Sequence, residues 1–357
     1  MAVFAFCEGE GRVELEMADP SGTPHFRATW KLRGPKDEPA GPSLAWDSLT
    51  VRSVHAHIED VRDRARAAFL GLAVGDALGA TVEFMTAGEI AARYGVHKEV
   101  MGGGWLHLKP GRVTDDTEMS LCIARALDAE GGWCLSAIAD RFAAWMRSSP
   151  IDVGSTCRRG IRRYMLDGTL EGPMNDGDAG NGAAMRMVPV ALASLGDPAL
   201  LEARAVEQAR LTHHHPLSDA ASVLVGRLVH LGCLGLSLRR LRQAAGEAVA
   251  REPKFSFESY RGQASGYVVD TVRTVLDAFF STRSLEECLI ATVNRGGDAD
   301  TNGAIAGAIA GAYYGPGEIP QRWAKKLDRT LVAEIRALAD RMVELSPLGR
   351  GEPARIA

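Results

Sequence analysis

From Ile58 onward, apolar residues recur three and four positions apart, which is the spacing of one face of an α-helix. No β-branched run that alternates with polar residues over the length of a strand interrupts this pattern. The sequence therefore predicts an all-α fold. The predicted helices cover residues 59–79, 119–127, 136–147, 155–166, 182–195, 198–211, 216–234, 238–251, 259–280, 285–293, 303–314 and 331–345.

The N-terminal region has a different pattern. Residues 12–17 and 26–32 alternate weakly around a Pro/Gly turn, and residues 34–42 have the composition of a linker. We therefore expect an N-terminal extension at 1–57, either a hairpin or disordered, a single compact multi-helix domain at 58–347, and a tail at 348–357.

Glycines form stripes in two of the predicted helices. Gly71, Gly75 and Gly79 repeat every four residues in the first helix, and the run from Gly303 to Gly315 repeats in the same way. A stripe of this kind places the glycines on one helix face, so a neighbouring helix can approach closely.

Two acidic clusters, at 114–118 and 298–301, combine carboxylates and hydroxyls at the predicted start of a helix. Neighbouring carboxylates such as Asp115 and Asp116 repel each other inside a protein unless a cation neutralises them. Each cluster alone is also typical of a helix cap, because Asp and Thr satisfy free N–H groups there. Both clusters precede small apolar helices that have little need of charge, so together they favour a site for hard divalent cations.

The donor types narrow the choice of metal. Neither cluster contains His or Cys, and oxygen ligands favour Mn²⁺ or Mg²⁺ over zinc. The pair Gly296 and Gly297 supplies the backbone freedom for a turn before Asp298. The run His213–His215 is not interpreted as a metal site, because three successive side chains cannot converge on one ion.

The composition limits which classes of protein this chain can belong to. A hydrophobic content of 46%, a net charge of -4 and a pI near 6.2 fit a large folded core and argue against a nucleic-acid partner. Six cysteines without a CxxC pair suit a reducing cytosol, so we expect a cytoplasmic protein. We see no secretory signal, and the most membrane-like segment, 303–315, is too short for a transmembrane segment.

Several short motifs occur in a recognisable order: GLAVGDALG at 71–79 with Glu83, TDDT at 114–117, GNGAAMR at 180–186, His213 to Pro216, and GGDADT at 296–301. Over residues 58–345 the chain resembles the ADP-ribosylglycohydrolase family. The resemblance implies an all-α fold with a dinuclear metal cleft that holds two Mn²⁺ ions, or Mg²⁺. The ligands that it implies are Thr114, Asp115, Asp116, Asp298, Asp300 and Thr301.

The resemblance also implies roles for residues outside the clusters. Glu83 and Asp152 would be the catalytic carboxylates, although Glu83 alone fits a solvated side chain and Asp152 fits an N-cap of the helix near Ser155. The glycine-rich loop at 175–182 leads into a predicted helix at Ala183 and would bind a diphosphate, or be a plain turn. The implied substrate-binding residues are Gly177, Asp178, Gly180, Asn181, Gly182 and His213.

The chain is most similar to the nitrogen-fixation branch of that family. This implies a hydrolase that removes ADP-ribose from an arginine of the ADP-ribosylated nitrogenase iron protein. It also implies a PII-type signalling protein as a partner and peripheral recruitment to the membrane. Alternatives are a hydrolase of serine-linked ADP-ribose or of O-acetyl-ADP-ribose, a non-catalytic ADP-ribose-binding module, and a metal phosphohydrolase, which the lack of His in the clusters disfavours.

One basic patch lies outside these motifs. Arg158, Arg159, Arg162 and Arg163 fall on a predicted helix, with pairs one turn apart. Such a patch is ordinarily a solvated face, and the alternative is a surface that receives an acidic protein.

Overall fold

The fold is described from a computed structural model, which covers residues 3–9, 12–18, 24–31, 57–352 and 354. The chain divides into two compact units. The larger is His55–Glu352, and the smaller contains the N-terminal strands. Each unit is described by itself.

The smaller unit contains a three-stranded antiparallel sheet of β1 (Val3–Gly9), β2 (Arg12–Ala18) and β3 (Pro24–Lys31), in the order β1-β2-β3. The alternating segments singled out in the sequence correspond to β2 and β3, whereas β1 was not predicted. The domain boundary near residue 57 stays a prediction, and the linker-like segment 34–42 lies outside the described residues.

The larger unit is helical, which confirms the predicted all-α class, and β-pairing among its described residues is limited to isolated bridges. Short 3₁₀ turns lie at Asp176–Asp178, Pro253–Phe255 and Pro316–Glu318. The helices are α1 (Ile58–Gly79), α2 (Ala87–Tyr94), α3 (Asp115–Glu130), α4 (Leu135–Arg147), α5 (Ser155–Asp167), α6 (Val188–Leu192), α7 (Pro198–Arg210), α8 (Pro216–Cys233), α9 (Leu238–Arg251), α10 (Val268–Ser281), α11 (Leu285–Val293), α12 (Ala299–Tyr314), α13 (Gln321–Ala324) and α14 (Arg329–Leu345).

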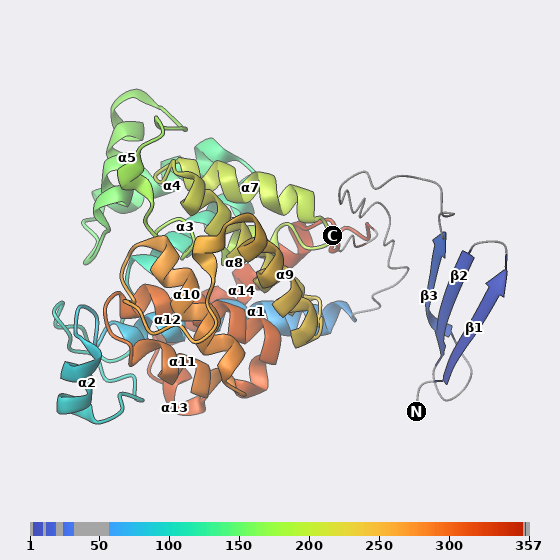
Figure 1. Cartoon of the computed structure of the whole chain (residues 1–357). Helices are drawn as coiled ribbons and strands as arrows, with labels where there is room; N and C mark the ends of the chain where they lie inside the picture. Colours follow the sequence, from blue (N-terminus) through green and yellow to red (C-terminus); the bar gives the residue numbers. More distant parts are fainter. Residues whose placement is uncertain (1–2, 10–11, 19–23, 32–56, 353, 355–357) are drawn as a thin grey trace. The chain divides into compact units, whose positions relative to one another are not determined.

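Helices α1 and α12 form the central pair of this unit (Figure 1). Their glycine stripes face each other, as the four-residue repeats predicted. A methyl group added at Gly75 would overlap the carbonyl oxygen of Gly303, and one added at Gly71 would overlap that of Gly307. The two backbones are therefore in direct contact, and every residue from Ala67 to Gly79 of α1 and from Ala299 to Ala312 of α12 is buried.

This antiparallel contact brings the end of α1 beside the start of α12. A methyl group at Gly79 would overlap the carbonyl of Ala299, the first residue of α12. The loop after α1 is fixed there by two backbone hydrogen bonds, from Phe84 N to Gly297 O at 2.7 Å and from Gly297 N to Met85 O at 2.8 Å. The glycine stripe thus places Glu83 next to the second acidic cluster.

Two predicted helices were wrong in their extent. The helix predicted at 182–195 is a series of turns followed by the short α6, and the one predicted at 259–280 begins only at Val268. Helix α2 was not predicted. The expected helix N-terminus at Ala183 is therefore absent, and any anion bound by this loop would meet turn backbone instead.

Two further expectations concern the whole chain. No helix within the described residues is long and apolar enough to cross a bilayer. The five cysteines whose side chains the structure describes, Cys122, Cys134, Cys157, Cys233 and Cys288, are free thiols.

Candidate metal centre

The first acidic cluster is anchored to α1 by Asp76, a fully buried carboxylate. Its oxygens accept from the backbone N–H of Thr114 at 3.0 Å and of Thr117 at 3.2 Å, and from the Thr117 hydroxyl at 2.5 Å. Burial raises the pKa of Asp76 to about 6, while these hydrogen bonds lower it. Asp76 therefore fixes the N-terminus of α3, where Asp115 and Asp116 stand, against the central helix.

Asp115 and Asp116 occupy the first turn of α3. Asp115 accepts a hydrogen bond from Gly154 N at 3.1 Å. Asp116 is fully buried, and one of its oxygens, Oδ2, lies 3.0 Å from the Thr114 hydroxyl. The other oxygen, Oδ1, has no hydrogen-bond partner. A buried carboxylate oxygen without a partner is costly, and a cation would satisfy it.

The second cluster is positioned by the turn before α12. Gly296 and Gly297 have φ values of 71° and 66°, so the predicted need for backbone freedom is confirmed. Asp298 then accepts from the Asn181 side-chain amide at 2.6 Å, and its own N–H donates to Ala264 O at 2.8 Å. Asp300, in the first turn of α12, is 2% exposed.

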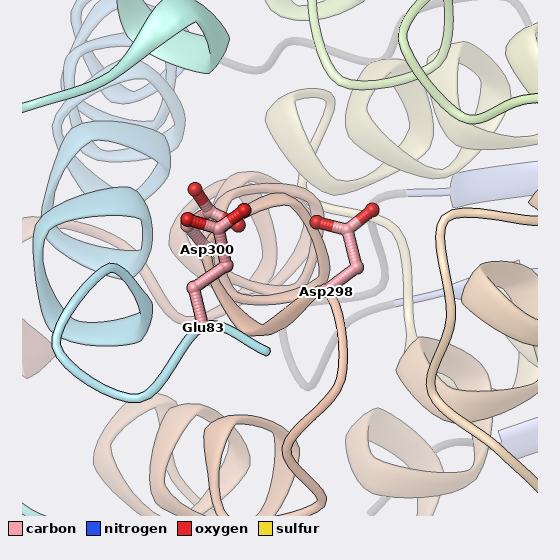
Figure 2. Close-up of side chains that lie close together, drawn as sticks. All are labelled: Glu83, Asp298 and Asp300. Atoms are coloured by element: carbon pink, nitrogen blue, oxygen red, sulfur yellow. The ribbon is translucent and has the colours of Figure 1, made fainter. Parts of the chain in front are cut away.

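Glu83 joins this second cluster. One carboxylate oxygen from each of Glu83, Asp298 and Asp300 lies within 4.8 Å of the others, and Figure 2 shows the three side chains reaching into the same space. Glu83 is held by the indole of Trp105, whose Nε1 donates to Oε2 at 2.6 Å. Trp105 in turn packs on Phe84, with ring centroids 5.4 Å apart.

Burial and mutual repulsion raise the pKa values of these carboxyls. Burial raises the pKa of Glu83 to about 8, with the charges of Asp152 and Asp298 adding to the effect. Burial and then the charge of Asp152 raise the pKa of Asp115 to about 7. The pKa values of Asp116 and Asp300 rise well above the usual range, mainly through burial. The cluster is thus poorly suited to carry full negative charge by itself.

The donor set fits divalent cations. Neither N-cap residue, Thr114 or Asp298, makes a side-chain capping hydrogen bond. Acidic residues do occupy the first turn of both helices, and Asp300 accepts from Thr301 N at 2.9 Å, so the interpretations as helix caps and as cation ligands are compatible. The unpartnered Asp116 oxygen at the start of α3 and the converging carboxylates of Glu83, Asp298 and Asp300 offer oxygen ligands to a hard cation.

A cleft of about 430 Å³ opens over these carboxylates. Asp152 lies in its wall rather than at a helix cap, since the N-cap of α5 is Gly154 and makes no side-chain cap. Burial raises the pKa of Asp152, and the charge of Asp298 adds to this. The cleft brings together ten of the predicted site residues: Glu83, Asp115, Asp152, Gly180, Asn181, Gly182, His213, Asp298, Asp300 and Thr301.

Four predicted site residues do not line this cleft: Thr114, Asp116, Gly177 and Asp178. Thr114 and Asp116 are fully buried, whereas Gly177 is exposed. The carboxylate of Asp178 forms an ion pair with Arg159, so it is directed to α5 and not to a bound phosphate.

The histidine run has three separate roles. His213 is fully buried in the cleft wall, where its Nδ1 lies 2.8 Å from the Thr212 hydroxyl and burial lowers its pKa well below the usual range. The expectation that the other two are satisfied structural histidines is confirmed. His214 Nδ1 lies 2.5 Å from Gly172 O, and His215 Nδ1 accepts from Leu217 N at the start of α8.

Sequence reasoning missed Asp76, Trp105 and Phe84. Asp76 carried a readable signal, since it is an isolated acid within the glycine stripe of an apolar helix. Trp105 and Phe84 had none, because the contacts of Trp105 with Glu83 and with Phe84 depend on how two loops meet in space.

Comparison with known proteins agrees with this fold. Residues 57–351 match the family model for ADP-ribosylglycohydrolase. The chain belongs to the ADP-ribosylglycohydrolase family. Among solved structures, a chain described as "ADP-ribosylglycohydrolase-related protein complex" aligns with a TM-score of 0.72 and 35% identity, covering 81% of this chain and 99% of that chain.

Two curated relatives are similar to this chain over most of its length. The chain is 56% identical over 288 residues to the ADP-ribosyl-[dinitrogen reductase] glycohydrolase of Rhodospirillum rubrum, which covers 81% of this chain and 98% of the relative. It is 28% identical over 345 residues to the ADP-ribosylarginine hydrolase Tri1 of Pseudomonas putida, covering 92% of this chain and 90% of that relative.

Divalent cations should stabilise the protein more at pH 8 than at pH 6. Without cations, the raised pKa values of Glu83 and Asp115 mean that the folded state binds more protons than the unfolded chain above pH 4, so its stability falls as pH rises toward 8. Cations replace those protons. We expect Mn²⁺ in large excess to raise the melting temperature by about 5 °C at pH 8 and by less at pH 6.

Thermal melts with Mn²⁺ or with EDTA at both pH values measure this effect. The core is large enough to fold without ions, so the EDTA-treated protein should still melt cooperatively and recover on addition of Mn²⁺. A cation effect that is larger at pH 6, or loss of the cooperative transition in EDTA, would contradict the assignment.

Proposed function

We propose that this protein is a metal-dependent hydrolase that cleaves the N-glycosidic bond between ADP-ribose and an arginine side chain of a target protein. The observation that carries the proposal is the 430 Å³ cleft, which joins two acidic clusters from distant parts of the chain in a fold shared with ADP-ribosylarginine hydrolases. A volume of this size is typical of small-ligand sites.

Asp115, Asp116, Asp298, Asp300, Thr301 and, through its hydroxyl, Thr114 are the proposed ligands of two Mn²⁺ ions, with Mg²⁺ as the alternative. Such cations supply Lewis acidity, which lowers the pKa of a water molecule and stabilises negative charge on oxygen. Asp76 and Asn181 are not among the proposed cation ligands. They hold Thr114 and Asp298 in place through the hydrogen bonds described above.

Glu83 and Asp152 are proposed to move the protons. Hydrolysis requires that a water lose a proton as its oxygen bonds to the anomeric carbon, and that the guanidine gain one as the carbon–nitrogen bond breaks. Both carboxylates line the cleft, and burial raises the pKa of each. Trp105 fixes the orientation of Glu83, so its indole acts as a positioning group.

The proposed target is dinitrogen reductase, the iron protein of nitrogenase. This rests on the name of the Rhodospirillum rubrum relative, with which the chain shares 56% identity over 98% of that protein's length. The predicted PII-type partner, membrane recruitment and cytoplasmic location stay predictions.

Product analysis tests the proposal. The protein with Mn²⁺ is incubated with arginine-linked ADP-ribosyl protein, serine-linked ADP-ribosyl protein and O-acetyl-ADP-ribose. We expect free ADP-ribose and unmodified arginine from the first substrate. Release from only the second or third would assign another linkage, AMP would indicate a phosphohydrolase, and binding without products would indicate a binding module.

Deleting residues 1–57 should leave arginine de-ADP-ribosylation nearly unchanged. Every residue assigned to the site lies within 76–301, and the family match begins at residue 57. Turnover and melting temperature of the truncated and full-length proteins measure the effect. A large loss of either would show that the extension belongs to the catalytic domain.

A further inference from the structure

Helix α5 starts in the wall of the cleft and runs outward from it. Ser155, Thr156 and Cys157, its first residues, line the cleft. At 1.5 Å per residue the helix continues for about 16 Å from Ser155 to Leu166. In Figure 1, α5 lies at the periphery of the helical unit, so its outer side faces solvent.

The outer side of α5 combines positive charge with exposed apolar side chains. Arg158, Arg162, Met165 and Leu166 fall three and four residues apart, which places them on one side of the helix, and we call this set the α5 face. Leu166 is 87% exposed and Met165 37% exposed. The buried residues of α5 are Cys157, Gly160 and Ile161, and Ile161, one turn before Met165, marks the edge where the α5 face meets the buried side.

The two arginines of the α5 face lack acidic partners. In the part of the chain that the structure describes, no carboxylate lies within ion-pair distance of Arg158 or Arg162. Three nearby acids are engaged elsewhere: Asp178 pairs with Arg159, Asp140 accepts from the Tyr164 hydroxyl, and Glu171 pairs with Arg210. Asp152 in the cleft wall makes no ion pair with Arg158, but burial raises the pKa of Asp152 and the charge of Arg158 lowers it.

The α5 face is therefore an unpaired positive patch with an apolar end on a chain whose net charge is -4. Exposed Met and Leu side chains do not improve solubility, so solubility alone does not explain their position on that side. A modified arginine on a folded protein also cannot fit wholly in the cleft, because the rest of its protein must rest on the cleft rim.

We propose that the α5 face is the docking surface for the protein substrate, and that it recognises an acidic surface next to the modified arginine. The inference rests on the proposed function. Arg158 and Arg162 steer the encounter through charge, whereas Leu166 and Met165 contribute apolar contact once the proteins meet.

The test compares a protein substrate with a small one. The single variants Arg162→Glu and Leu166→Ser are assayed on arginine-ADP-ribosylated dinitrogen reductase and on free ADP-ribosyl-arginine. Arg239→Glu on α9 is the matched control, because this residue is exposed, lies outside the cleft lining and changes net charge equally.

We expect the α5 charge reversal to lower kcat/KM for the protein substrate about tenfold at low salt, with the difference shrinking as salt screens the charges. Leu166→Ser should lower it at low and high salt alike. Neither change should alter kcat/KM for ADP-ribosyl-arginine by more than about twofold, and the α9 control should behave like the parent.

An equal loss of kcat/KM on both substrates would overturn the proposal, because it would show that the variants impair the cleft rather than the docking of the protein substrate. Unchanged turnover of the protein substrate at all salt concentrations would also overturn it. Binding to phosphatidylserine vesicles is measured as well. A charge reversal that removed only vesicle binding and left turnover unchanged would assign the α5 face to a lipid surface and overturn the proposal. Absence of turnover by the parent on both substrates would instead contradict the proposed function.

Discussion

Replacing Asp300 with alanine should lower hydrolysis by about a thousandfold and remove one bound cation. A methyl group cannot replace an anionic ligand, and cation Lewis acidity contributes several kcal/mol to catalysis, with 1.4 kcal/mol for each factor of ten. The metal-free variant should melt no lower than the parent, because it loses one of several carboxylates that repel each other when buried.

Metal stoichiometry, single-turnover rate and melting temperature separate these effects. Asp176→Ala is the control, since this carboxylate is exposed and does not line the cleft. The control should keep both cations and the parental rate. A folded Asp300→Ala protein that binds two cations and turns over at the parental rate would show that the site is assigned wrongly.

Replacing Gly75 with alanine should destabilise the domain by about 3 kcal/mol. The added methyl would overlap the carbonyl group of Gly303, so α1 and α12 would have to separate. The helix-propensity gain of about 1 kcal/mol offsets only part of this cost. Activity should fall as well, because the same contact places Glu83 beside Asp298 and Asp300.

Gly246→Ala provides the matched comparison for Gly75→Ala. Gly246 lies inside α9, is exposed, and has nothing within 4 Å of an added methyl. Only the propensity term remains there, so we expect a gain of about 0.5 to 1 kcal/mol. Denaturant unfolding of both variants measures the difference, and equal effects at the two positions would show that the α1–α12 contact does not limit stability.

The sequence predicts the scaffold because its signals are local. The glycine repeats at Gly71–Gly79 and Gly303–Gly315 lie on single helices, so their spacing alone predicts a close helix contact. The acidic clusters are equally compact, and the Gly296–Gly297 turn follows from two adjacent residues. The structure confirms the helix contact and the turn, whereas the metal-binding role of the clusters stays a prediction.

Local sequence signals could have prevented two of the errors in the predicted helices. Thr86 and Glu89 form a capping box at the start of α2, and that spacing is readable in the sequence. Pro189 lies in the first turn of α6, where proline is favoured, and it contradicts a continuous helix from residue 182.

The parts of the site that the sequence did not predict depend on contacts between residues far apart in the chain. Asp76 meets Thr114 across 38 positions, and Trp105 meets Glu83 across 22. Such pairs have no periodic spacing, so no pattern along the chain predicts them. The partners of Asn181 and Asp178 could not be predicted for the same reason, since each lies on another element, and their role in substrate binding stays a prediction.

The most direct test of the central claim is anomalous diffraction at the manganese edge from crystals of the full-length protein grown with Mn²⁺. The account predicts two manganese peaks in the cleft, next to the carboxylates of Asp115 and Asp116 and of Asp298 and Asp300. Peaks only outside the cleft, or none in it at saturating Mn²⁺, would contradict the claim that these clusters form the metal centre.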